Sequence, residues 1–170
     1  MVGYTHKTRY DLPVRLSPNL PNMDAVYLYP SLCFFEGAKV SVGRGTDFPF
    51  QLMGFPGYKN GDYEFKPVEI AGVIKDPPFE NQLCKGVKLN AKKELVLKSG
   101  QLQIEWIVQM YKAYSDSAAF FIPFFDKLAG TDKLRKQIQA NWSVEEIRKS
   151  WQPGLQSYLT KRKKYLLYED

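Results

Sequence analysis

The 170-residue sequence contains one histidine, His6, and only two cysteines, Cys33 and Cys84. A single histidine in an irregular segment argues against His-dependent catalytic triads and His-ligated metal sites. Two cysteines are too few for a disulfide scaffold and have no zinc-ligand spacing, so they either pair with each other or stay as buried free thiols. Any chemistry must therefore use carboxylates, arginine, tyrosine or backbone groups, and we expect neither a metal nor a cofactor.

Long apolar runs are also missing. No stretch of eighteen apolar residues could span a membrane, and the polar N-terminus, interrupted by Pro13, lacks the apolar region of a signal peptide. We therefore expect the chain as given to be soluble, with no membrane partner. A start at Met1 followed by an irregular segment would also suit a piece of a longer, exported precursor.

Positive charge is in excess. The net charge is +6, and four consecutive cations occupy positions 161–164. A solvated helix end, where cations interact favourably with the helix dipole, is the favoured interpretation of that cluster. A nucleic-acid patch is the alternative, but no RNA-recognition, zinc-finger or helix-turn-helix motif accompanies the charge, so we expect no nucleic-acid partner.

Length and composition predict one globular domain over residues 1–170, with 44% apolar residues to build a core. The pattern changes near Gly100. Residues 1–100 are rich in glycine, proline, aromatic and β-branched residues in short pieces, which favours strands and long ordered loops. Residues 101–170 have helical periodicity. We therefore predict an α+β fold, in which a small, mostly antiparallel sheet packs against several helices.

The first predicted helix covers residues 101–114, where one stripe is apolar. A broken, buried helical segment follows around Pro123 and ends at Gly130. The residues of the stripe are Leu102, Trp106, Ile107, Met110, Tyr111 and Tyr114.

Further helices are predicted from capping residues. Thr131 or Asp132 caps a helix that buries Leu134 and Ile138. Ser143 and Glu146 form a capping box that starts the next helix, which contains Val144, Ile147 and Trp151. A last helix is expected to bury the apolar members of one face, formed by Leu155, Tyr158, Leu159 and Arg162.

The most chemically suggestive stretch surrounds Arg44. Gly43 and Gly45 flank this arginine, so the backbone can adopt positive φ and approach a ligand while the guanidinium points outward. Glu36 follows an apolar run and precedes Gly37, where a strand would deliver a carboxylate to the rim of a sheet. The residues either form an internal ion pair that braces a turn, or face a ligand together.

Three segments carry a family motif, at residues 17–57, 81–90 and 151–168. Their residues resemble the C-terminal domain of the NamZ-type exo-β-N-acetylmuramidases, whose motif reads S-P-N-x-P, then Y-P, then E-G-T, a nearby Ser, and G-R-G-T-x-x-P-F. The chain departs from this motif at Ala38, where the family usually has threonine. The matching residues are Ser17, Pro18, Asn19, Pro21, Tyr29, Pro30, Glu36, Gly37, Ser41, Gly43, Arg44, Gly45, Thr46, Pro49 and Phe50.

The resemblance implies a glycosidase that removes N-acetylmuramic acid from the non-reducing end of peptidoglycan fragments. In that family the active site lies between a Rossmann-like N-terminal domain and a smaller C-terminal domain, and this chain resembles only the smaller one. It implies a substrate-side domain, inactive alone, whose partners are a muropeptide or related glycan and the N-terminal domain. By family analogy the setting is periplasmic or secreted. The alternative is a stand-alone carbohydrate-binding or scaffold module.

The resemblance also suggests roles for individual residues. Arg44 could bind the lactyl carboxylate of muramic acid in a bidentate manner. Glu36 could hold a sugar hydroxyl, orient Arg44 or act as the catalytic acid or base, and we rank orientation first because a carboxylate beside an arginine tends to stay ionised. Asn19, Ser41 and Thr46 are candidate hydrogen-bonding residues for substrate.

The remaining candidates shape the site. Gly37, Gly43 and Gly45 are expected to shape the loop. Aromatic side chains could stack on a sugar ring, but core packing is the favoured role for each of them. These aromatic candidates are Tyr27, Tyr29, Phe48 and Phe55.

Overall fold

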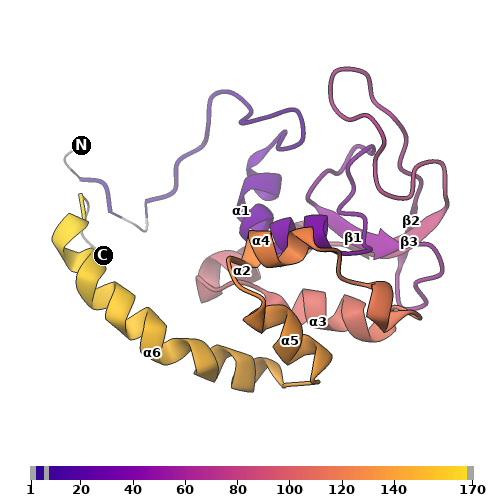
Figure 1. Ribbon diagram of the computed structural model, residues 1–170. Coiled ribbons are helices and arrows are strands. Elements are labelled where there is room, and N and C mark those ends of the chain that lie inside the picture. The colour runs from indigo at the N-terminus through magenta and orange to yellow at the C-terminus, as the bar shows by residue number, and fades with distance from the viewer. Residues whose placement is uncertain (1–2, 6–7, 168–170) are drawn as a thin grey trace.

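The computed structural model describes residues 3–5 and 8–167, so His6 lies outside the described residues. Within them, three strands and six α-helices confirm the predicted α+β fold (Figure 1). All strand pairs are antiparallel, and β3 lies between the other two, with Met53 opposite Val87 and Glu64 opposite Lys85. The strands are β1 (Leu52–Phe55), β2 (Tyr63–Phe65) and β3 (Cys84–Lys88).

The segment before the sheet is helical, which corrects the prediction that a strand delivers Glu36. Helix α1 (Met23–Leu32) is followed directly by a short 3₁₀ helix, η1 (Cys33–Gly37), which contains that residue. The side chain of Asn22 accepts a hydrogen bond from the backbone N–H of Ala25 at 3.0 Å and so caps the helix. This local cap outweighs the aromatic composition that suggested a strand.

A second unpredicted helix lies at the composition boundary. Helix α2 (Lys93–Ser99) ends at Gly100, which has a φ of 59° and so provides the left-handed C-cap. Gly100 therefore marks the end of a helix within the first half of the chain, where only strands and loops were expected.

The helices after Gly100 follow the sequence pattern. Trp106, Ile107 and Met110 are buried, as the stripe predicts. In the interrupted segment a short 3₁₀ helix, η3 (Ser117–Ala119), precedes Pro123, and the α-helix begins only after Pro123 and ends at Gly130, with a φ of 69°. These helices are α3 (Ile104–Ala113), α4 (Phe124–Ala129) and α5 (Lys133–Gln139), and the last of them buries Leu134 and Ile138.

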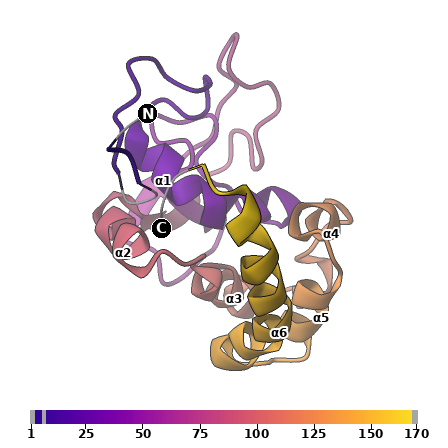
Figure 2. The same ribbon diagram turned by 90° about the vertical axis from the view of Figure 1, so that its left-hand side faces the viewer.

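The last helix departs from expectation. Ser143 and Glu146 form the predicted capping box, but α6 (Val144–Arg162) continues through Pro153 as one helix instead of two. Its second half extends away from the rest of the molecule (Figures 1 and 2). The predicted burial of its apolar face is wrong, since Leu155 is 43% and Tyr158 60% exposed.

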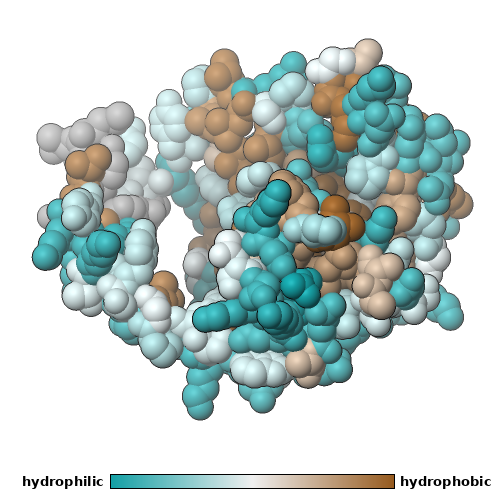
Figure 3. Space-filling model, in the orientation of Figure 1, coloured by the Kyte–Doolittle hydropathy of each residue, from teal (hydrophilic) through white to brown (hydrophobic). Residues whose placement is uncertain are grey.

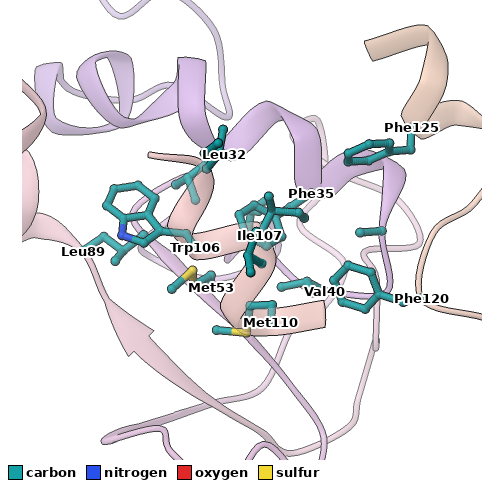
Figure 4. Packing of buried hydrophobic residues seen from close by; sticks show 14 of the residues in the cluster. Leu32, Phe35, Val40, Met53, Leu89, Trp106, Ile107, Met110, Phe120 and Phe125 are labelled. Atoms are coloured by element: carbon teal, nitrogen blue, oxygen red, sulfur yellow. The ribbon is translucent and has the colours of Figure 1, made fainter. Parts of the chain in front are cut away.

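The main hydrophobic core lies between η1, α3 and the segments that join them to the sheet. Figure 4 shows Phe35 from η1 directed towards Ile107 and Met110 from α3, with Met53 and Val40 close by. Phe125 at the start of α4 closes one side of this core. The core therefore fixes the position of η1, and with it the backbone that carries Glu36.

Both cysteines are free thiols, which settles the open alternative. Cys84 is buried with Leu52 and Phe65 in a second, smaller core, and burial raises the pKa of its thiol to about 11. Cys33 is half-buried, and its thiol donates to the carbonyl oxygen of Pro30 at 3.4 Å. Among the described helices, none combines the length and apolar character needed to cross a bilayer.

Candidate functional site

A hollow of about 500 Å³ lies between η1, the loop after it, residues 78–79 and the entrance to α4. Its three charged residues are Glu36, Lys39 and Arg44. The other lining residues are apolar, and they are Phe35, Ala38, Val40, Val42, Pro78, Phe79, Ile122 and Phe124. The arrangement is a mostly apolar pocket with two cations and one carboxyl group.

Glu36 and Arg44 meet in this pocket, as the sequence predicts. The guanidinium Nη1 of Arg44 lies 3.5 Å from the Oε2 of Glu36, and the two side chains are 31% and 25% exposed. The pair is therefore partly shielded from water yet open towards the hollow. An arginine in such a position can exchange its internal partner for a carboxylate that enters from outside.

Asn19 positions the arginine. The Nε of Arg44 donates to the Oδ1 of Asn19 at 3.4 Å, while the Nδ2 of Asn19 donates to the carbonyl oxygen of Val73 at 3.2 Å. The backbone N–H of Asn19 donates to the hydroxyl of Ser17 at 3.2 Å. Asn19 therefore contacts the arginine rather than the pocket, whose lining does not include it.

The glycines of the motif occupy places where a side chain would not fit. Gly43 has a φ of 79°, and a Cβ there would collide with the carbonyl oxygen of Phe48. Gly45 has a φ of 83°, and its carbonyl accepts from the N–H of Val68 at 3.0 Å. Gly37 has an ordinary φ, but a Cβ there would overlap the backbone of Phe125. The predicted loop-shaping roles rest on this geometry.

The hydroxyl groups of Ser41 and Thr46 are used inside the loop. Ser41 is fully buried, and its Oγ accepts from the N–H of Gly43 at 3.2 Å. The Oγ1 of Thr46 donates to the carbonyl oxygen of Gly43 at 2.7 Å and accepts from the N–H of Phe48 at 3.0 Å. Neither residue lines the pocket around Arg44, so their visible work is to hold the loop.

The pKa of the Glu36 carboxyl group is shifted upwards, whereas a neighbouring arginine alone would shift it downwards. Burial raises the pKa of its carboxyl group, and the positive charge of Arg44 offsets that effect only in part. The sequence-based argument rests on the neighbouring arginine alone, which favours the ionised form. Desolvation is the larger cause because the Glu36 side chain is only 25% exposed.

Three pocket residues escaped sequence analysis: Lys39, Phe79 and Phe124. Lys39 and Phe124 come together through long-range backbone pairing, since the N–H of Lys39 donates to the carbonyl of Phe120 at 2.8 Å and that of Ile122 to the carbonyl of Gly37 at 2.9 Å. No local pattern encodes this pairing. The only available signal for Phe79 was its place after two prolines in a turn-rich segment, and its φ is 60°.

The aromatic residues proposed for sugar stacking lie elsewhere. Tyr29 packs edge-on against Phe50 with ring centroids 5.0 Å apart, and Phe48 packs against Tyr63 at 6.1 Å. Phe55 is buried in the core, and Tyr27 is half-buried and does not line the pocket; these positions are in keeping with the favoured packing role.

Comparison with known proteins decides the family. A family model described as exo-beta-N-acetylmuramidase NamZ, C-terminal, matches residues 27–168. The chain belongs to this family. A curated relative, the peptidoglycan beta-N-acetylmuramidase NamZ of Bacillus subtilis (strain 168), is 34% identical over 165 residues. The match covers 89% of this chain and 39% of the NamZ relative.

Two solved structures of DUF1343 family proteins from Bacteroides fragilis are similar to the chain. One has a TM-score of 0.92 and 45% identity, and the match covers 99% of this chain and 48% of that one. The other has a TM-score of 0.65 and 16% identity, with 98% and 49% covered, and shows likeness of fold alone. The chain therefore spans two fifths to half of the length of the relatives and solved structures that it matches.

Proposed function

We propose that this chain is the substrate-side domain of a peptidoglycan-degrading exo-β-N-acetylmuramidase, in which Arg44 binds the lactyl carboxylate of a terminal N-acetylmuramic acid. The observation that supports this most directly is the Arg44–Glu36 pair at the wall of an apolar pocket. A guanidinium offers two parallel donors to a carboxylate, which gives both affinity and orientation. N-acetylglucosamine has no such carboxylate, so the same contact would discriminate between the two sugars.

The rest of the pocket suits a sugar acid. Lys39 adds a second cation on the same wall, and strengthens the attraction for an anion. Phe79 and Phe124 offer apolar faces, and Phe124 is 46% exposed, so its ring is accessible to a pyranose. Apolar walls with a few fixed polar groups are typical of small-ligand sites.

Glu36 is the proposed acid in this arrangement. When a ligand carboxylate binds Arg44, it competes for the guanidinium that stabilises ionised Glu36. Because burial already raises the pKa of this carboxyl group, a weaker interaction with Arg44 and a new negative charge nearby favour the protonated form further. A protonated carboxyl group can donate to the glycosidic oxygen of the leaving group.

A glycosidase of this kind uses two carboxyl groups, one on each side of the scissile bond. Among the described residues that line the pocket, Glu36 is the only acid. We therefore propose that the second carboxyl group comes from a Rossmann-like N-terminal domain and that the active site is shared between the two domains. Peptidoglycan as substrate would place the protein in the periplasm or outside the cell.

Isothermal titration calorimetry with N-acetylmuramic acid and N-acetylglucosamine tests the proposal. N-acetylmuramic acid is expected to bind the unmodified chain at least tenfold more tightly than N-acetylglucosamine does. Arg44→Ala is expected to remove this preference, which corresponds to a loss of about 1.4 kcal/mol of binding free energy for N-acetylmuramic acid. Arg9→Ala, which removes an exposed arginine paired with Glu94, is the matched control and should keep the preference. Equal affinity for both sugars in the unmodified chain would contradict the carboxylate clamp.

An assay of substrate turnover distinguishes the proposed glycosidase domain from a stand-alone binding module. Release of N-acetylmuramic acid from peptidoglycan fragments should require both this chain and the N-terminal portion of a longer relative, such as the 45% identical Bacteroides protein. Binding by the chain, without turnover in any such mixture or fusion, would favour the non-catalytic module.

A further inference from the structure

Helix α6 consists of two halves with different surroundings. In the first half, Ile147 is fully buried, and the guanidinium of Arg148 donates to the carbonyl of Leu102 at 2.6 Å and pairs with Glu105 at 3.1 Å. These contacts hold the start of the helix against α3. From Pro153 onwards the helix leaves the body, and Figure 3 shows an open space between this arm, residues 153–162, and the rest of the molecule.

The arm carries an apolar stripe that nothing among the described residues covers fully. Leu155 and Tyr158 of the arm are three residues apart on one helix face, and they continue the line of Trp151, which precedes the arm and packs against the main core. They line a groove of about 610 Å³ together with residues of α5. The other residues of the groove are Thr131, Lys133, Gln137, Ser150 and Gly154.

A partner that covers the apolar stripe would stabilise the projecting arm. A short helix without tertiary packing is marginally stable in water, because most helical stability in proteins comes from burial of an apolar face. Exposed apolar surface bordered by polar groups is typical of interaction sites. Here the border is basic, with Lys133 in the groove and Lys161 on the next turn of the arm.

The comparison with relatives indicates which partner fits. The Bacteroides structure at 45% identity aligns with 99% of this chain at a TM-score of 0.92, yet less than half of that chain is used. The rest of that protein is therefore available to cover a surface that this chain leaves open. The N-terminal end of the described chain and the far end of α6 lie on the same side of the molecule in Figure 1, so a domain that precedes this chain would start on the side where the arm projects.

We propose that the arm and its groove form the docking surface for the N-terminal domain of the longer family members. The inference rests on the proposed function only for the identity of the partner. The fitting surface on that domain is an apolar ridge bordered by acidic side chains, which would match the stripe and its lysines. Docking at the arm would hold the two domains together at a place separate from the sugar pocket.

Hydrogen–deuterium exchange tests this surface without reference to sugar binding. The N-terminal portion of the Bacteroides relative is fused ahead of this chain, in that protein's own order, and compared with the chain alone. The arm is expected to exchange at least tenfold more slowly in the fusion, while the paired strands β1 and β3, which lie outside the groove, change less than twofold. If the fusion does not fold, the same portion is added as a separate polypeptide, and the same slowing is expected.

Variants make the result specific. The double change Leu155→Glu and Tyr158→Glu should restore fast exchange in the fusion, whereas Leu83→Glu, at an exposed leucine outside the groove, should not. Unchanged exchange of the arm in both fusion and mixture would overturn the proposal. Protection in the chain alone that grows with protein concentration would also overturn it, since a second copy would then be the occupant. Binding of N-acetylmuramic acid, measured on the same samples, tests the sugar pocket independently of docking at the arm.

Discussion

The loop over residues 41–50 and the arm of α6 differ in whether their side chains find partners within the described residues. In the loop, the polar groups of Ser41 and Thr46 find partners within ten residues, and the glycine positions allow the backbone to fold tightly. In the arm, apolar side chains such as Leu155 and Tyr158 remain exposed. A self-contained loop can preform a binding site, whereas exposed apolar side chains on a helix face are typical of interaction surfaces.

The largest expected effect separates the two halves of α6. Ile147→Ala should lower the free energy of unfolding by about 3 to 4 kcal/mol, because Ile147 is fully buried. Leu155→Ala should change it by less than about 0.5 kcal/mol in the isolated chain, because that side chain is exposed. Urea denaturation measures both. Equal losses of unfolding free energy in the two variants would show that the arm is as well packed as the first half of α6, which would contradict the difference between the two halves.

Glycine substitutions make a smaller difference between the loop and the arm. Gly43→Ala should destabilise the fold by about 2 to 3 kcal/mol, because its φ is 79° and a Cβ would meet the backbone of Phe48. Gly154→Ala is the matched control: its surroundings are open and it lies within a helix, so the change should stabilise by roughly 0.5 to 1 kcal/mol. Thermal unfolding of both variants would show shifts of opposite sign. A loss of stability in Gly154→Ala would mean that the helix needs the backbone freedom of glycine at this position to bend.

The smallest effect concerns pH and sharpens the account of the loop. Because burial raises the pKa of Glu36, the native state binds more protons than the unfolded state between the ordinary value and the raised one. The stability contributed by this group is therefore present at low pH and is lost as pH rises through that interval. Glu36→Gln should flatten this slope in denaturation curves measured between pH 4 and 8.

The same ionisation should affect binding. Protonation of Glu36 removes a negative charge beside Arg44, while the ligand carboxylate stays ionised. N-acetylmuramic acid should therefore bind about two- to threefold more tightly near pH 5.5, where its carboxylate is still ionised, than near pH 8, and Glu36→Gln should abolish the dependence. Tighter binding at high pH would contradict the proposed competition for Arg44.

Local signals in the sequence predicted much of the helical half. The capping box at Ser143 and Glu146, the stop at Gly130 and the buried pair Leu134 and Ile138 all depend on neighbours within a few residues. The same reasoning failed for α1, where aromatic composition suggested a strand while the cap at Asn22 and the core contacts of η1 favoured helix. Composition was the weaker signal because these aromatic residues pack equally well from a helix.

The site was only partly accessible to sequence reasoning. The family motif and the glycine-flanked arginine indicated that Glu36 and Arg44 lie together, and the structure brings them within 3.5 Å. Lys39, Phe79 and Phe124 join the pocket through contacts across the chain, which no spacing rule encodes. For Leu155 the helical pattern was predicted correctly, but the described residues leave its side chain 43% exposed.

The most direct measurement follows the side-chain Nε–H signal of Arg44 by NMR during titration with N-acetylmuramic acid, with N-acetylglucosamine as the reference sugar. This group donates to Asn19 in the free protein, so its signal reports on the guanidinium itself. We predict a saturable shift with the muramic sugar and none with the reference. A signal that stays unmoved while muramic acid binds elsewhere on the chain would contradict the account.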